Sequence, residues 1–165
     1  MKVALDTNIL AYAEGTNGVT MRNTALDLVQ KLPNDSTFLP AQALGELFNV
    51  LVRKAGRSKA AARTAMLDWG DAFPLIETTG AVMLGAADLA NDHQFGIWDG
   101  IILSSAADAG CRLLLSEDLQ EGFTWSGVTV TNPFSESRHA LLDALLEGRQ
   151  SAPPSAALER RADST

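Results

Sequence analysis

Sulfur and imidazole side chains are scarce in this sequence, which contains one cysteine and two histidines among 165 residues. A single cysteine cannot form an intramolecular disulfide. Cys111 stands at the head of the apolar stretch CRLLL, which favours a buried thiol over a nucleophile. Thiol redox chemistry is therefore excluded. For His93 and His139 we favour loop or helix-end positions over a role in a site.

Long apolar runs are also missing. No stretch reaches the roughly 18 apolar residues that a membrane-spanning helix needs. The apolar run after Lys2 is broken at Asp6, which is too early for the apolar region of a signal peptide. The sequence therefore predicts a cytoplasmic protein with no membrane partner. Its hydrophobic content of 46% is typical of a globular domain with a real core.

Basic residues are outnumbered, because Lys and Arg total 13 whereas Asp and Glu total 20. The net charge of −7 argues against a protein that binds nucleic acid over a broad surface. The balance reverses locally, since no acid occurs between Glu46 and Asp68. A solvated helix face and a surface that contacts phosphates or a partner are both open interpretations of this segment. Its five basic residues are Arg53, Lys54, Arg57, Lys59 and Arg63.

Short apolar segments alternate with helical patterns along the chain. Strands separated by helices favour parallel pairing with right-handed crossovers, so the predicted fold class is α/β, with three layers (α/β/α) around a central parallel sheet. Strands are predicted at KVALD, TFL, CRLLL and VTVTNPF, and LIET is either a strand or an extended link. Helices are predicted at about 7–13, 20–32, 41–55, 58–69, 80–92 and 98–110. We expect one domain over residues 1–134, a C-terminal helix over 135–148, and a flexible tail over 149–165.

Acidic residues follow two of the predicted strands. Asp6 ends KVALD, and Ser116, Glu117 and Asp118 follow CRLLL directly. Burying a carboxylate costs several kcal/mol unless a partner, a proton or a metal compensates it. Because ligand sites in open α/β sheets form beyond the carboxyl ends of the strands, both groups are candidates for one site.

Two further acids lie on predicted helices. Asp99 heads the apolar stripe of the helix WDGIILSSAADAG, where it is either a site residue or the N-cap of that helix. Glu46 lies on a polar face opposite the apolar stripe of its helix, and this face either meets water or lines a cleft. The other members of that polar face are Gln42, Asn49 and Arg53.

Acids without basic neighbours repel one another if they converge on one pocket, unless a cation neutralises them. With oxygen ligands available and few histidines or cysteines, Mg²⁺ or Mn²⁺ is favoured over Zn²⁺.

The order Asp6-Thr7-Asn8, Glu46, Asp99 followed by two isoleucines, and Ser116-Glu117-Asp118 resembles the PIN-domain ribonucleases, most closely the VapC-type toxins of bacterial toxin–antitoxin pairs. The resemblance covers residues 1 to about 134. It implies that four acids are catalytic and bind Mg²⁺ or Mn²⁺: Asp6, Glu46, Asp99 and Asp118. Thr7, Asn8 and Ser116 match supporting positions, and Glu117 is the alternative to Asp118.

The resemblance also implies a function and partners. The expected reaction is metal-assisted hydrolysis of RNA phosphodiester bonds. The expected partners are the RNA substrate, a cognate antitoxin protein and a second copy of the chain. Among the basic residues, Arg53, Lys54 and Arg57 are the candidates for RNA contacts.

Two alternatives compete with this interpretation. One is a PIN-like module that binds RNA or protein without cleaving it. The other is a phosphatase of the haloacid-dehalogenase kind, which needs a second Asp two residues after the first and a downstream lysine. This sequence has Asn8 at that place and no lysine after Lys59.

Overall fold

The computed structural model describes residues 1–147; residues 148–165, which include the predicted tail, lie outside the described part. A six-stranded sheet has the order β3-β2-β1-β4-β6-β5. Its strands are β1 (Val3–Leu5), β2 (Thr37–Pro40), β3 (Leu75–Ile76), β4 (Leu113–Leu115), β5 (Thr124–Trp125) and β6 (Val128–Thr131). Every pairing is parallel except that of β5 with β6.

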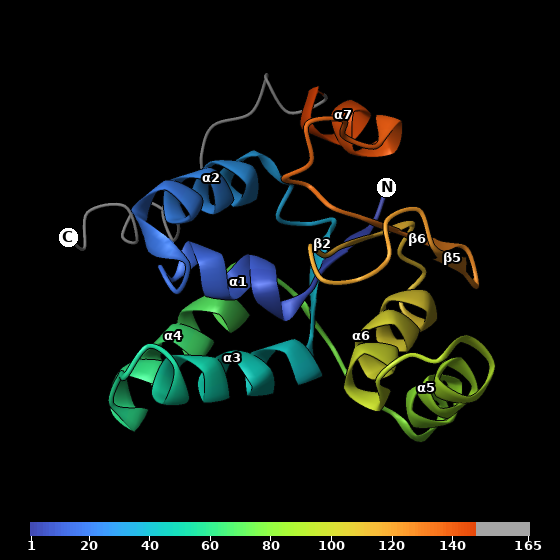
Figure 1. The fold of residues 1–165 in the computed structure, drawn as a ribbon, viewed down its shortest axis with the longest axis horizontal. Coiled ribbons are helices and arrows are strands. Elements are labelled where there is room, and N and C mark those ends of the chain that lie inside the picture. Colours follow the sequence, from blue (N-terminus) through green and yellow to red (C-terminus); the bar gives the residue numbers. More distant parts are fainter. Residues whose placement is uncertain (148–165) are drawn as a thin grey trace.

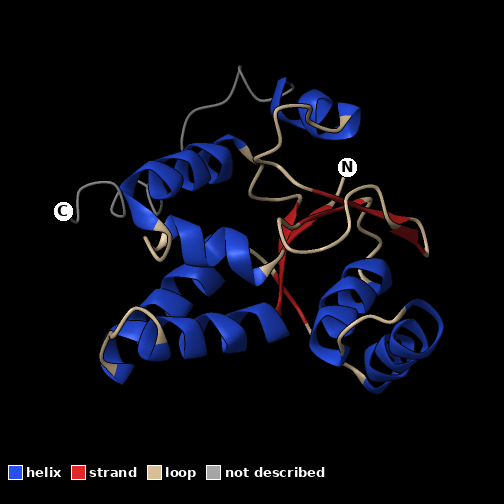
Figure 2. Cartoon of the chain, viewed as in Figure 1, coloured by secondary structure: helices blue, strands red, loops and turns tan. Residues whose placement is uncertain are grey.

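Helices cover both faces of this sheet, as Figures 1 and 2 show. Helices α1 to α4 gather on one side, and α5 and α6 on the other. Their bounds are α1 (Thr7–Ala13), α2 (Gly18–Lys31), α3 (Ala41–Arg53), α4 (Lys59–Ala72), α5 (Gly80–His93), α6 (Ile97–Asp108) and α7 (Ala140–Glu147). The predicted α/β/α class with a mostly parallel sheet is therefore confirmed.

The two central strands are fully buried, because both of their faces are covered by helices. Every residue of β1 and β4 is completely shielded from solvent, and Leu5 pairs in register with Leu115. The carboxyl ends of β1 and β4 consequently lie side by side. This places Asp6 and Ser116, which follow the two strands, at the same edge of the sheet.

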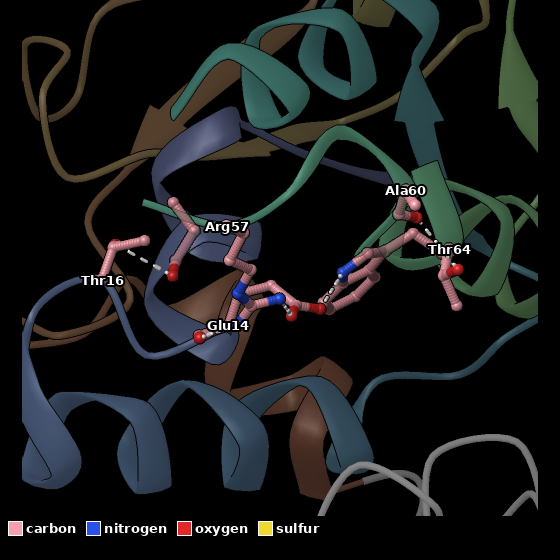
Figure 3. Close-up of polar contacts among 7 residues, drawn as sticks. Glu14, Thr16, Arg57, Ala60 and Thr64 are labelled. Carbon is pink, nitrogen blue, oxygen red and sulfur yellow. Dashed lines mark hydrogen bonds and ion pairs between the residues drawn. The ribbon is translucent and has the colours of Figure 1, made fainter. Parts of the chain in front are cut away.

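Helix α1 is tied to the α3–α4 connection at its far end. Glu14, the C-cap of α1, accepts hydrogen bonds from the Arg57 guanidinium at 2.7 Å and from the Trp69 indole at 2.9 Å. Arg57 also donates to the Glu14 backbone carbonyl at 2.6 Å. Figure 3 shows Arg57 reaching Glu14 from the neighbouring chain segment. These bonds hold the C-terminal end of α1 against the segment that connects α3 to α4 and against α4 itself.

Helices α5 and α6 pack closely through glycines. A β-carbon on Gly100 would lie 3.0 Å from the Ala86 carbonyl oxygen and 3.3 Å from the Ala86 α-carbon, and one on Gly85 would collide with the Ser104 hydroxyl. Because the obstacle at Gly100 is backbone, it cannot rotate away. Gly100 therefore sets the approach of α6 to α5 one residue after Asp99.

Two sequence predictions differ from the structure in detail. Strand β5 was not predicted; it pairs with β6 through a tight turn at Ser126 and Gly127, which both have positive φ. The C-terminal helix begins at Ala140, five residues later than the predicted start at 135. Among the described residues no helix is long and apolar enough to cross a membrane.

Candidate active site

Asp6 lies between β1 and α1 and is only 5% exposed. It is the N-cap of α1, where its carboxylate accepts a 2.6 Å hydrogen bond from the Thr7 backbone N–H. The Ser116 hydroxyl donates to Asp6 Oδ2 at 2.6 Å, and the Asn8 amide donates to the same oxygen at 3.1 Å. The carboxylate expected to need a partner is thus held by three donors from both strand ends.

Glu46 reaches the same site from α3. The Thr7 hydroxyl donates to Glu46 Oε2 at 2.9 Å, and the Gln42 amide donates to Glu46 Oε1 at 3.0 Å. Both carboxylate oxygens are therefore fixed. The polar face of α3 lines the site at Glu46 rather than only meeting water.

Asn8 connects α1 to the segment after β4. Its amide lies 3.3 Å from the Ser116 hydroxyl and 3.3 Å from Asp118 Oδ2, in addition to the bond to Asp6. Its carbonyl oxygen accepts a 3.3 Å hydrogen bond from the Glu117 backbone N–H. A single side chain thus links Asp6 with the segment that carries Asp118.

Glu117 and Asp118 have different partners. Asp118 Oδ2 is contacted by Asn8, whereas the Glu117 carboxylate accepts a hydrogen bond from the Tyr12 hydroxyl. The pKa of Asp99 is raised in part by the charge of Asp118, and Glu117 makes no such contribution. This geometry favours Asp118 as the fourth acid of the site.

Asp99 lies in the first turn of α6, whose N-cap is Gly96. The capping interpretation of Asp99 is therefore wrong, because the helix begins two residues earlier, at Ile97. Gly96 has no side chain that could mark this boundary in the sequence. Asp99 is half-buried near the other acids, and its carboxylate oxygen lies 3.1 Å from the position a Gly96 β-carbon would occupy.

The electrostatics of the site come from acids alone. The pKa of Asp6 is raised from 3.8 to about 6. Burial is the largest cause, and the charges of Asp99 and Glu46 add to it, whereas the hydrogen bonds from Ser116 and Thr7 oppose it. Burial also raises the pKa of Asp99, and the charges of Glu46 and Asp118 add to that rise. Every charged group that shifts these two pKa values is a carboxylate.

A divalent cation fits the chemistry of this donor set, because four mutually repelling carboxylates are hard oxygen ligands. The spacing of the acids fits a bound metal less well than their chemistry does. Within residues 1–147, no three His, Cys, Asp or Glu side chains stand close enough together to form a ready-made metal-binding group.

A sequence model of the PIN domain matches residues 3–121, which is most of the chain and includes all four acids. The chain belongs to the PIN-domain family. This membership replaces the phosphatase alternative. Among curated proteins, none matches the chain in sequence.

Solved structures with the same fold include toxins and toxin–antitoxin complexes. The Mycobacterium tuberculosis toxin VapC20, described as cleaving the sarcin-ricin loop, is 17% identical with a TM-score of 0.61 over 71% of this chain and 90% of that one. VapBC2 from Rickettsia felis, bound to promoter DNA, is 19% identical with a TM-score of 0.59 over 80% and 98% of the two chains. FitAcB from Neisseria gonorrhoeae is 19% identical with a TM-score of 0.59 over 79% and 97%. At these identities the likeness establishes the PIN fold.

The basic residues of this PIN domain are divided between two environments. Arg53 and Lys54 are exposed at the end of α3, where a substrate can reach them. Arg57 is instead half-buried and paired with Glu14. The structure thus gives Arg57 a partner that the sequence analysis did not anticipate.

Two residues that contact the site acids had no role assigned from the sequence, although Gln42 was named there as part of the polar face of the helix that carries Glu46. Tyr12 contacts Glu117, and Gln42 contacts Glu46. Each stands four residues from a predicted site residue on the same helix, Tyr12 from Asn8 and Gln42 from Glu46, and such residues share a helix face. This spacing is the signal that could have identified them.

Proposed function

We propose that this PIN domain is a divalent-metal-dependent endoribonuclease that hydrolyses phosphodiester bonds in single-stranded or looped RNA. The observation that carries the proposal is the convergence of four acids from four separate segments: the charges of the other acids raise the pKa of Asp6 and of Asp99, and no basic side chain is among the groups that shift these two pKa values. Four carboxylates alone repel anions, so the site can bind a phosphate only when a cation is present.

The residues have separate roles in this proposal. Asp6, Glu46, Asp99 and Asp118 would hold Mg²⁺ or Mn²⁺, and the cation supplies the charge that polarises a phosphoryl oxygen. Thr7, Asn8 and Ser116 hold the acids in place through the hydrogen bonds described above. Glu46 or Asp118 orients the attacking water.

Exposed basic residues at the end of α3 extend the proposed site. Arg53 lies seven residues after Glu46, so it shares a helix face with Glu46 and lies about 10 Å farther along the axis. A strand of RNA passing over Glu46 can therefore place a neighbouring phosphate at Arg53 or Lys54. We assign the RNA contacts to these two residues and the internal ion pair to Arg57.

The purified full chain tests the nuclease proposal. With Mg²⁺ or Mn²⁺ it should cleave RNA, and EDTA should stop the reaction. Asp6→Ala and Asp99→Ala should each abolish cleavage, whereas Asp27→Ala, which removes an exposed acid paired with Lys31 on α2, should not. RNA binding without cleavage in any metal would favour the non-catalytic module instead, and cleavage in EDTA would exclude the metal-dependent reaction.

We further propose that the chain is a cytoplasmic toxin with a protein antitoxin and a homodimeric assembly. The solved VapBC and FitAB complexes with the same fold support this role. The net charge of −7 suits a partner with a basic segment. Expression of the chain alone should arrest bacterial growth, and co-expression of a small protein encoded beside it should relieve the arrest. Normal growth with active protein present would contradict the toxin role.

A further inference from the structure

Tyr12 and Glu117 form a contact that the proposed reaction does not use. Tyr12 lies one helical turn after Asn8 on α1, and its hydroxyl donates to Glu117 Oε2. The bond joins residues 105 positions apart. Since Glu117 directly precedes Asp118, this contact acts on the segment that carries the fourth acid.

The segment is held at two points by one face of α1. Tyr12 binds the Glu117 side chain, and the Asn8 carbonyl oxygen accepts from the Glu117 backbone N–H at 3.3 Å. The Asn8 amide then contacts Asp118 Oδ2. Glu117 is thereby hydrogen-bonded to Tyr12, while the Asp118 carboxylate contacts Asn8.

The Tyr12 hydroxyl is well suited to be a fixed donor. Its ring is half-buried and packs against Phe134, with 5.9 Å between ring centroids, so the hydroxyl has little freedom to leave Glu117. Burial raises the pKa of Tyr12 above its ordinary value, and the neighbouring carboxylates raise it further. The hydroxyl therefore keeps its proton at every pH at which an enzyme of this kind operates.

We propose that Tyr12 is a positioning residue that keeps the Glu117 carboxylate in a hydrogen bond and so leaves Asp118 as the fourth acid of the site. This inference rests on the proposed nuclease function. It assigns different roles to two adjacent acids, and it gives α1 control over the segment after β4.

Kinetics of four variants test the proposal. Tyr12→Phe removes only the hydroxyl and should lower kcat for RNA cleavage about tenfold with little change in KM, because a lost hydrogen bond to a charged group is worth at least that factor. Glu117→Gln should cost no more than Tyr12→Phe, and the double variant should cost no more than Tyr12→Phe alone. Asp118→Asn should lose at least a hundredfold.

A second measurement is independent of activity. Tyr12 is the sole tyrosine, so protein labelled with 3-fluorotyrosine gives a single ¹⁹F resonance. Glu117→Gln should shift this resonance without metal, and Mg²⁺ should shift it in the wild-type protein but not in Asp118→Asn.

Separate outcomes overturn the two proposals. Equal losses in Glu117→Gln and Asp118→Asn, additive losses in the double variant, or wild-type kinetics in Tyr12→Phe would each contradict the role of Tyr12 alone. A wild-type protein that neither cleaves RNA nor binds Mg²⁺ would contradict the nuclease proposal.

Discussion

Asp6 shows at the scale of one residue how a functional site opposes stability. Its carboxylate is buried, and the charges of Asp99 and Glu46 make ionisation still harder. A protein selected only for stability would place a neutral side chain there, and Asn would keep the helix cap. The proposed cation explains why an acid is present instead.

The raised pKa of Asp6 predicts how the stability of the metal-free protein depends on pH. Folded Asp6 keeps its proton up to about pH 6, whereas the unfolded chain releases it near 3.8. Its contribution to stability is therefore full below about pH 4 and is lost as the pH rises through 6. Asp6→Asn lacks this loss and should be more stable than the wild type at pH 7, by at most about 3 kcal/mol.

Thermal unfolding in EDTA between pH 4 and pH 8 measures this difference. The gap between Asp6→Asn and the wild type should widen as the pH rises from 4 to 6, and Asp27→Asn should show no such gap. Parallel curves for the wild type and Asp6→Asn would contradict the buried, cation-dependent state of Asp6.

At the scale of secondary structure, the position of Asp99 depends on how α6 packs on α5. Gly100 faces the Ala86 backbone with no room for a β-carbon, and it follows Asp99 directly. Gly100→Ala should therefore destabilise the protein by about 1–3 kcal/mol and lower RNA cleavage, since the first turn of α6 must move.

Gly45 provides the matched control for this prediction. It lies within α3 one residue before Glu46, and a β-carbon there meets nothing within 4 Å. Gly45→Ala should raise stability by roughly 0.5–1 kcal/mol through its helix propensity and leave cleavage intact. Denaturant unfolding of both variants provides the comparison, and equal effects of the two substitutions would contradict the packing role of Gly100.

The ion pair at the end of α1 makes a second prediction at this scale. Arg57→Gln removes the guanidinium that donates to the Glu14 carboxylate and should lower stability by about 2 kcal/mol, a fall of roughly 4–8 °C in Tm. Arg53→Gln removes an exposed charge, so it should weaken RNA binding and leave Tm unchanged. Thermal unfolding and RNA-binding titrations of both variants distinguish these roles; reversed effects would contradict our assignment of the two arginines.

The elements that the sequence predicts well are those with a local signal. Periodic apolar residues predict α2 and α3, and Ser58 predicts the start of α4, where it caps the helix as expected. Strand β5 has only two residues, too few for any period, and depends on its pairing with β6. The start of α6 is capped by Gly96, which offers no side-chain signal.

At the scale of the whole molecule, the site residues show the same difference between positions with a local sequence signal and positions without one. That Asp6 and Asp118 lie close together could be predicted, because the carboxyl ends of parallel strands meet at one edge of the sheet. The role of Tyr12 depends on a residue 105 positions away, and the role of Arg57 on one 43 positions away. No local pattern contains such partners, so only the fold reveals them.

The whole molecule combines an acidic surface with an acidic site, although its proposed substrate is an anion. The net charge of −7 gives no broad attraction for RNA, so binding must come from a cation in the site and from a few exposed residues such as Arg53 and Lys54. The central claim is therefore that Asp6, Glu46, Asp99 and Asp118 together bind one divalent cation.

Titration of Mn²⁺ into the purified protein, followed by the electron paramagnetic resonance signal of free Mn²⁺, tests this claim most directly. The wild type and Asp27→Asn should bind Mn²⁺ alike, and Asp6→Asn, Glu46→Gln, Asp99→Asn and Asp118→Asn should each weaken binding at least tenfold while remaining folded. Undiminished Mn²⁺ affinity in the four variants, or no binding by the wild type, would contradict the account.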